Sequence, residues 1–238
     1  MKTLAVILAA GKGSRLNSDE PKSMYEIKGK PMIEHIVSSI ESIGDIDTLV
    51  VVGHKKQYII DYPAGRVRYV EQKELNGTGH ALLVAEDCLD AYDDIFVFMG
   101  DSPFIDSSTI LRMKEEHKKN NSDCTFLYST FPFNLPYARL VFDAERKLEY
   151  LVEDSVANEK EREIKEFFTS QYLFKSSSIC RNLNRLKKDK VTGEINLTDI
   201  INVFINQRMR LCPLYIDDYW RLMGINTPED LLIVQRSI

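Results

Sequence analysis

The first half of the chain alternates short apolar runs with amphipathic segments, and this alternation constrains the fold more than any other feature. The apolar runs occupy residues 3–10, 48–53, 66–72 and 94–100, and the segments between them have helical periodicity. Near-continuous runs of β-branched and aromatic residues are typical of parallel strands covered by helices on both faces. We therefore expect an α/β fold with a doubly wound, mostly parallel, Rossmann-like sheet. Ligands of such sheets bind at the carboxyl ends of the strands.

The second half has a different rhythm. Beyond residue 123 the sequence predicts a strand, and then a hairpin with its turn near residues 143–147. Further helices and a strand follow, with Thr198 as the expected N-cap of one helix. Because 238 residues suffice for one sizeable core, we expect a single domain over 1–238, with an α/β half at about 1–122 and a half with a smaller β-rich flap at about 123–238.

The composition of the chain limits the classes of molecule that we expect it to bind. The net charge of −5 offers no reason to expect nucleic acid or an anionic membrane, both of which reward a basic surface. Four scattered cysteines form no CxxC pair, which indicates reduced thiols. The N-terminus imitates a signal peptide, but its apolar run is short and rich in β-formers, and no run approaches the ~20 residues that span a bilayer. We expect a cytoplasmic protein that binds small molecules.

Residues 8–24, LAAGKGSRLNSDEPKSM, follow the first apolar run and combine two glycines with three basic residues. A Walker A loop and a dinucleotide-binding loop would each need a glycine where this chain has Leu16. Gly11 and Gly13 allow the backbone to approach an anion closely, and basic side chains surround it. Such charge suits a triphosphate that releases pyrophosphate. The alternative is a glycine-rich turn in which the three basic residues, Lys12, Arg15 and Lys22, are simply solvated.

Two further segments follow predicted strands. In EQKELNGTGHAL, the amide of Gln72 complements a pyrimidine edge, and Gly77 allows a base to lie against the backbone. The alternative is a helix capped by Thr78, with His80 on the surface. In DIFVFMGDSPFI, Asp101 ends an apolar strand, where a hard oxygen ligand can hold Mg2+. A second ligand must come from elsewhere in the chain, and the residues alone leave three candidates open: Asn226, Asp230 and Asp217.

The ordered set LAAGKGSRL, PK, GTGHA, GD, LVED, LTDII and GIN resembles the sugar-phosphate nucleotidyltransferases. More closely, it is similar to the N-terminal pyrophosphorylase domain of N-acetylglucosamine-1-phosphate uridylyltransferases. The resemblance covers nearly the whole chain and implies a GT-A-like sheet with a nucleotide-binding first half and an acceptor-binding second half. We expect no left-handed β-helix domain, because the sequence stops shortly after its last predicted helix.

The resemblance also implies roles for individual residues. Arg15 and Lys22 would support phosphate binding and catalysis, and Asp101 with Asn226 would bind Mg2+. Glu153 would hold a sugar hydroxyl, and Thr198 would lie near the sugar phosphate. The implied nucleotide-binding residues are Leu8, Ala9, Gly11, Gln72, Gly77 and Thr78, to which the loop analysis adds Gly13.

The acceptor half departs from the family pattern. Phe168 in EFFTSQ replaces an asparagine that contacts the amino sugar, and Ser170 replaces a glycine. Ala138 replaces a glycine beside the N-acetyl group, and Asn196 replaces a tyrosine. Sugar hydroxyls buried against a phenyl ring would lose hydrogen bonds, so we expect an acceptor other than N-acetylglucosamine 1-phosphate.

Three hypotheses follow. The first is a Mg2+-dependent enzyme that transfers a nucleotidyl group from UTP or CTP to a small phosphorylated acceptor, with a sugar 1-phosphate favoured by resemblance. The second is a CTP-dependent cytidylyltransferase for phosphocholine or a phosphorylated amino acid, in which Glu153 meets an ammonium group and Phe168 faces it. The third is a non-catalytic nucleotide-binding regulator. The amide of Gln72 does not separate UTP from CTP, because its rotation exchanges donor and acceptor.

Overall fold

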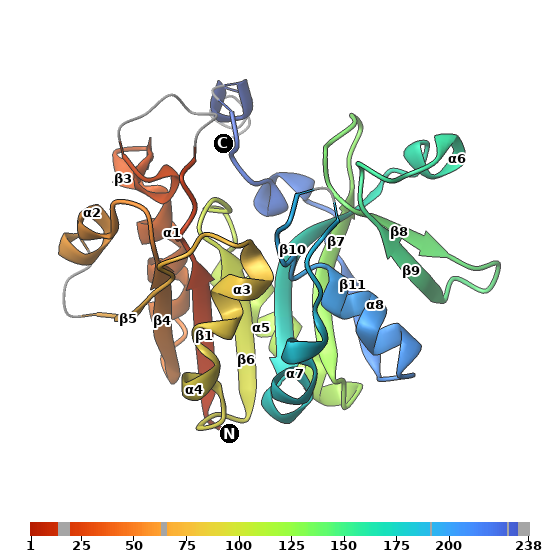
Figure 1. Ribbon diagram of the computed structural model, residues 1–238, viewed down its shortest axis with the longest axis horizontal. Helices are drawn as coiled ribbons and strands as arrows, with labels where there is room; N and C mark the ends of the chain where they lie inside the picture. Colours follow the sequence, from red (N-terminus) through yellow and green to blue (C-terminus); the bar gives the residue numbers. More distant parts are fainter. Residues whose placement is uncertain (14–19, 63–65, 191, 228, 233–238) are drawn as a thin grey trace.

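One mixed sheet forms the centre of the molecule, with helices on both faces (Figure 1). The computed structural model describes residues 1–13, 20–62, 66–190, 192–227 and 229–232. The main path of the sheet runs in the order β11-β7-β10-β6-β1-β4-β5. These strands are β1 (Thr3–Leu8), β4 (Ile46–Val52), β5 (Arg68–Glu71), β6 (Asp94–Met99), β7 (Cys124–Thr130), β10 (Glu166–Lys175) and β11 (Leu211–Tyr215).

The first half of the sheet is parallel, as the sequence predicts. Strand β1 pairs with both β4 and β6 in parallel, and β4 pairs with β5 in parallel. All six residues of β1 are buried, because helices cover both faces of the sheet. This arrangement brings the carboxyl ends of the four strands to one edge, where the segments after β1, β5 and β6 meet.

Helices cover the two faces in separate groups. In the view of Figure 1, α3, α4, α7 and α8 lie in front of the sheet, and α1 and α5 lie behind it. The apolar side chains of α1 and α5 pack into one core cluster, and those of α3, α7 and α8 pack into another. The helices are α1 (Met32–Glu41), α2 (Lys56–Asp61), α3 (Thr78–Leu83), α4 (Glu86–Leu89), α5 (Ser107–Lys119), α6 (Glu159–Arg162), α7 (Ser176–Asn182) and α8 (Asp199–Asn206).

The predicted flap is a hairpin of β8 (Arg139–Phe142) and β9 (Leu148–Val152), which projects from the sheet beside α6 (Figure 1). Asp143 accepts hydrogen bonds from the backbone N–H groups of Glu145 and Lys147 and so closes the turn. The remaining short elements are β2 (Glu26–Ile27), β3 (Lys30–Pro31) and the 3-10 turns η2 (Lys22–Met24), η3 (Leu183–Arg185) and η4 (Tyr219–Leu222).

The structure differs from the sequence predictions at several elements. Strand β10 was not expected, and it runs antiparallel between β6 and β7, so the sheet is mixed. The segment of helical periodicity between β5 and β6 forms two short helices, α3 and α4, rather than one. Thr198 occupies the N-cap position of α8 but makes no side-chain cap bond. Residues 229–232 are helical, and the rest of the expected last helix lies outside the described residues.

Among the helices that the structure describes, none is both long and apolar enough to cross a lipid bilayer.

Candidate active site

A cavity of about 530 Å³ opens at the carboxyl edge of the parallel strands. The segments that follow β1, β5 and β6 contribute to its wall, as do Lys22 and Asn226 from distant parts of the chain. Every described residue that the sequence assigns to the nucleotide or the metal lines this cavity: Leu8, Ala9, Gly11, Gly13, Lys22, Gln72, Gly77, Thr78, Asp101 and Asn226. Arg15 lies outside the described residues.

The loop after β1 is shaped by one required glycine. Gly13 has φ +62°, and a Cβ atom there would lie 2.5 Å from the Cβ of Lys22. A side chain at this position would therefore push Lys22 away from the loop. Gly11 is exposed, and no described atom lies within 4 Å of the place where its Cβ would be. The backbone at Gly11 is thus open to a ligand in the cavity.

Lys22 joins the two predicted metal ligands. Its ammonium nitrogen donates to Asn226 Oδ1 at 2.6 Å and forms an ion pair with Asp101. The side chains of Lys22 and Asp101 are 16% and 25% exposed, so the ion pair is partly shielded from water. The Asp101 and Asn226 oxygens thus converge on one cationic point, and oxygens of these kinds are among the ligands of Mg2+ in proteins.

The segment that carries Asn226 is fixed by three neighbours. The N–H of Gly224 donates to the hydroxyl of Tyr137 at 3.1 Å, and the N–H of Ile225 donates to the carbonyl oxygen of Asp101 at 2.9 Å. The carboxylate of Asp230 accepts from the N–H of Asn226 at 2.8 Å. Burial raises the pKa of Tyr137, and the negative charge of Asp101 raises it further, so this hydroxyl stays protonated.

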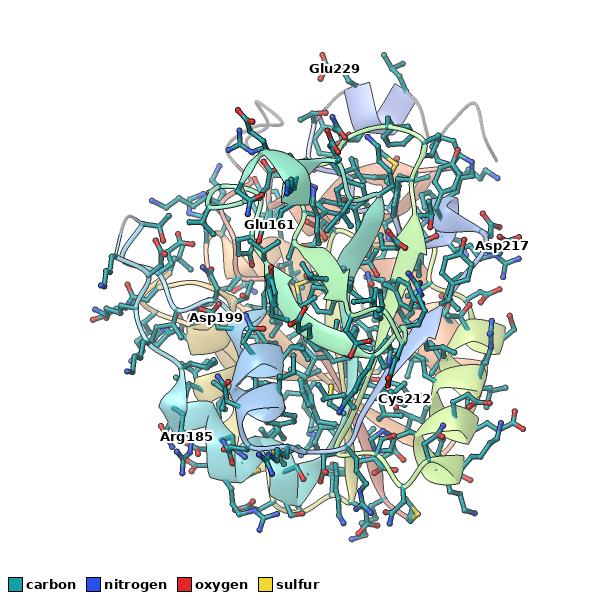
Figure 2. The ribbon with its side chains drawn as sticks, turned by 90° about the vertical axis from the view of Figure 1, so that its right-hand side faces the viewer. Glu161, Arg185, Asp199, Cys212, Asp217 and Glu229 are labelled. Carbon is teal, nitrogen blue, oxygen red and sulfur yellow. The ribbon has the colours of Figure 1, made fainter. Side chains whose placement is uncertain are left out.

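This geometry separates the three candidate partners of Asp101. Asp230 supports the backbone of Asn226 from behind. Asp217 is exposed at the periphery of the molecule (Figure 2). Asn226 alone of the three shares a cation with Asp101 among the contacts in the described part of the chain. In that part no cluster of three or more His, Cys, Asp or Glu side chains could hold a metal.

Gln72 occupies a buried place at the end of β5. Its backbone N–H donates to Val52 O at 2.7 Å, and its side chain is held in the cavity wall. The amide nitrogen lies 3.1 Å from Gly77 O and 3.0 Å from Nδ1 of His80. His80, which the alternative interpretation left on the surface, is therefore part of this site.

The 76–79 segment is bound to the second half of the chain. Gly79 N donates to Ile195 O at 2.7 Å, and Ile195 N donates to Asn76 O at 2.8 Å. The hydroxyl of Thr78 accepts from Leu197 N at 2.9 Å. Thr78 is therefore not the cap of α3, whose N-cap residue is Gly77. Three hydrogen bonds thus link the wall of the cavity to the segment that leads into α8.

The predicted acceptor residues form a separate group beside the flap. Burial raises the pKa of Glu153, a hydrogen bond with Thr198 opposes this shift, and the carboxylates of Asp199, Asp154 and Asp189 raise the pKa further. Asp199 lies at the start of α8 (Figure 2). One of these three carboxylates, Asp154, is ion-paired with Arg139 at 2.7 Å.

Two of the unusual residues of EFFTSQ have clear structural consequences. Phe168 is 2% exposed and packs edge to face on Phe126 and Tyr172, at 5.3 and 5.2 Å between ring centroids. Its ring lies in the core rather than in the open cavity. Ser170 has φ +59°, a left-handed conformation that favours glycine, and it sits at an irregularity in the pairing of β10 with β7.

The other two departures also lie near this segment. Ala138 is 4% exposed, and its carbonyl oxygen accepts from Phe168 N at 2.8 Å. Asn196 is half-buried and directly precedes Leu197, whose N–H donates to Thr78. The backbone next to Asn196 thus connects the predicted acceptor residues to Thr78 in the cavity wall.

Sequence reasoning missed several residues of the site. Tyr137 gives no signal in the sequence, because its contact with Gly224 depends on how distant segments pack. Glu194 and Leu75 line the cavity, and only their places beside LTDII and GTGHA could have suggested them. A second cavity of about 470 Å³ shares Lys12, Gln72 and Leu75 with the first one.

Curated proteins of known name are similar to this chain over most of its length. The bifunctional protein GlmU of Lactococcus lactis subsp. lactis (strain IL1403) is 33% identical over 227 residues, which are 95% of this chain and 50% of that protein. The GlmU of Thermosipho africanus (strain TCF52B) is 36% identical over 238 residues, again 50% of its length. The chain thus spans about half the length of the curated relatives it matches.

A solved structure supports the fold. A UDP-glucose pyrophosphorylase complexed with UDP-glucose superposes with a TM-score of 0.79 at 19% identity, covering 100% of this chain and 98% of that one. The profile of the MobA-like NTP transferase domain matches residues 5–192. The resemblance and the Rossmann-like fold expected from the sequence are therefore confirmed. The chain belongs to the family of MobA-like NTP transferase domains.

Proposed function

We propose that this protein is a nucleotidyltransferase that joins a nucleoside monophosphate to a small phosphorylated acceptor and releases pyrophosphate. The observation that carries the proposal is the convergence of three groups on one cavity: the glycine-rich loop after β1, the Gln72–Gly77 wall, and the Lys22, Asp101 and Asn226 cluster. These three groups correspond, in that order, to the triphosphate of a nucleotide, to its base and to the metal ion that its phosphates bind. The relatives named GlmU and the superposed pyrophosphorylase agree with a reaction of this class.

The reaction balances without a covalent intermediate. An oxygen of the acceptor's phosphate forms a new bond to the α-phosphorus, and the bond from that phosphorus to the bridging oxygen of pyrophosphate breaks. The backbone at Gly11 holds the phosphates, and the ammonium of Lys22 stabilises the negative charge that develops on them. Positioning and charge neutralisation account for most of the rate enhancement in such transfers.

Asp101 and Asn226 fit a Mg2+ ion, because their oxygens already converge on the Lys22 ammonium. Bound there with the triphosphate, Mg2+ would neutralise phosphate charge and act as a Lewis acid. A site with two protein oxygens is typical for Mg2+, which keeps several waters and phosphate oxygens as its remaining ligands.

Two acceptor classes remain under this proposal. A sugar 1-phosphate is the acceptor that the resemblance favours. A cationic acceptor such as phosphocholine is favoured by one observation: burial and the carboxylates of Asp199, Asp154 and Asp189 raise the pKa of Glu153, although Asp154 is itself paired with Arg139. A bound cation would relieve that repulsion. Phe168 does not contribute a cation-π contact in this arrangement, because its ring is buried.

The test is an assay of pyrophosphate release across four nucleoside triphosphates and a panel of phosphorylated sugars, phosphocholine and phosphorylated amino acids. Turnover with one triphosphate and one acceptor class would support the proposal. The variant Glu153→Gln separates the acceptor classes, because it should weaken a cationic acceptor at least tenfold and a neutral sugar far less. Nucleotide binding with no turnover for any acceptor would contradict the proposal and favour a regulatory nucleotide-binding protein.

A further inference from the structure

The orientation of one buried amide determines what the cavity can recognise. Gln72 is 3% exposed, and its nitrogen faces both Gly77 O and Nδ1 of His80. A backbone carbonyl oxygen can only accept a hydrogen bond, so the atom of the amide that faces Gly77 must be the nitrogen. A rotated amide would set two oxygens against each other.

Both hydrogens of this amide are then used. One N–H of Gln72 donates to Gly77 O, and the other donates to Nδ1 of His80. His80 can accept only as the neutral tautomer that carries its hydrogen on Nε2. Only the amide oxygen of Gln72 is left for a ligand, and an oxygen of this kind accepts.

We propose that His80 is a positioning residue that, together with the carbonyl oxygen of Gly77, fixes the Gln72 amide, so that the site selects a nucleobase with a hydrogen-bond donor on the edge that Gln72 meets. This inference rests on the proposed function, because it requires that a nucleotide base lie against Gln72. The donor is the N3–H of a uracil or the 4-amino group of a cytosine. The rotation of the Gln72 amide, which would exchange its donor and its acceptor, is thus removed, and the fixed oxygen accepts from either pyrimidine.

The surroundings keep His80 in place. It stands in the first turn of α3, directly after Gly79, whose N–H donates to Ile195 O at 2.7 Å. A Cβ at Gly79 would lie 2.7 Å from a side-chain carbon of Ile195, so α3 begins in close contact with that segment. The backbone that carries His80 is therefore held before any ligand arrives, which limits the reorganisation of the amide on binding.

Two variants of His80 test the inference. In His80→Asn the side-chain oxygen can take the place of Nδ1 as an acceptor, whereas in His80→Leu a group of similar size cannot accept. The probes are UTP, CTP, 3-methyluridine triphosphate and a cytidine triphosphate analogue without its 4-amino group. Their affinities are measured by calorimetry without acceptor, so that no turnover is needed.

We expect the unaltered protein to bind the donor-deficient analogue of its preferred nucleotide at least tenfold more weakly than the parent nucleotide. In His80→Leu only the carbonyl oxygen of Gly77 still orients the amide, so this discrimination should fall by at least about threefold, and His80→Asn should restore it. The KM for the nucleotide should rise in His80→Leu, and the KM for the acceptor should not change. A structural role alone would not produce rescue by asparagine.

The inference is wrong if His80→Leu discriminates as well as the unaltered protein, or if the donor-deficient analogues bind as tightly as their parents. Either result leaves the proposed function intact, because the nucleotides still bind. Failure of every nucleoside triphosphate to bind would instead contradict the proposed function itself. Thermal unfolding of each variant shows that the changes act on binding rather than on folding.

Discussion

The ammonium nitrogen of Lys22 lies 2.6 Å from the amide oxygen of Asn226, and the same nitrogen is ion-paired with Asp101. Lys22 belongs to the loop after β1, Asp101 follows β6, and Asn226 lies near the end of the described chain. Three distant segments therefore meet at one charged point. This point is where the proposed reaction would bring the metal and the α-phosphate together.

Removal of the Asp101 charge should abolish activity while the protein stays folded. Asp101→Asn keeps the shape of the side chain but lowers its affinity for a divalent cation, so we expect a loss of turnover of at least about 100-fold. Pyrophosphate release measures the loss, and thermal unfolding checks the fold. Asp217→Asn is the matched control, because Asp217 is an exposed carboxylate that should not affect turnover. Residual activity above a few per cent in Asp101→Asn would argue against a metal ligand at this position.

Gly77 should tolerate no side chain. Its φ is +95°, and a Cβ there would lie 2.5 Å from Ile195 O, so Gly77→Ala combines backbone strain with a clash against backbone. We expect a loss of more than about 2 kcal/mol in the free energy of unfolding. Gly44→Ala is the control, because Gly44 also has positive φ but has no described atom near its Cβ, and should lose only about 1 kcal/mol. Equal losses in urea unfolding would show that the packing against Ile195 is not tight.

Ser170 carries a strained backbone that glycine would relieve. Its φ of +59° costs about 1 kcal/mol for a residue with a Cβ. Ser170→Ala removes the hydroxyl and keeps the backbone strain, whereas Ser170→Gly removes the hydroxyl and also relieves the strain. We expect Ser170→Gly to be more stable than Ser170→Ala by about 1 kcal/mol in chemical unfolding. The opposite order would mean that the strand does not adopt the left-handed conformation in solution.

The stability contribution of Glu153 should depend on pH. Burial, together with the carboxylates of Asp199, Asp154 and Asp189, raises its pKa in the folded protein above the ordinary value of 4.5. The folded state therefore binds the proton more tightly, and this stabilisation is lost as the pH rises through the folded pKa. Glu153→Gln should unfold at a higher temperature than the unaltered protein at pH 7.5 and at nearly the same temperature at pH 4. An equal melting temperature at pH 7.5 would contradict the raised pKa.

Much of the fold follows from local pattern. The runs that form β1, β4 and β6 are apolar over most of their length because both of their faces are buried, and the spacing of Ile33, Ile36, Val37 and Ile40 predicts α1. Strand β10 could not be predicted in this way. Its sequence EFFTSQYLFK mixes polar and aromatic residues and is interrupted by the conformation of Ser170, so its pairing depends on β6 and β7.

The residues of the site also fall into those that the local sequence predicts and those whose contacts depend on folding. The residues at strand ends, such as Gln72 and Asp101, could be identified because ligands of parallel sheets bind at that edge. The contacts of Tyr137 with Gly224 and of Thr78 with Leu197 could not, since they depend on segments brought together only by folding. The burial of Phe168 was missed for the same reason, because the sequence does not show which face of β10 it occupies.

The central claim is that a nucleotidyl group passes from a nucleoside triphosphate to a phosphorylated acceptor. The most direct test follows two radioactive labels, one on the α-phosphate and one on the γ-phosphate of the nucleotide, with sugar 1-phosphates and phosphocholine as acceptors. We expect the α-label to enter a product joined to the acceptor and the γ-label to leave entirely in pyrophosphate. Transfer of the γ-label to the acceptor, its release as orthophosphate, or no transfer of the α-label to any acceptor would contradict it.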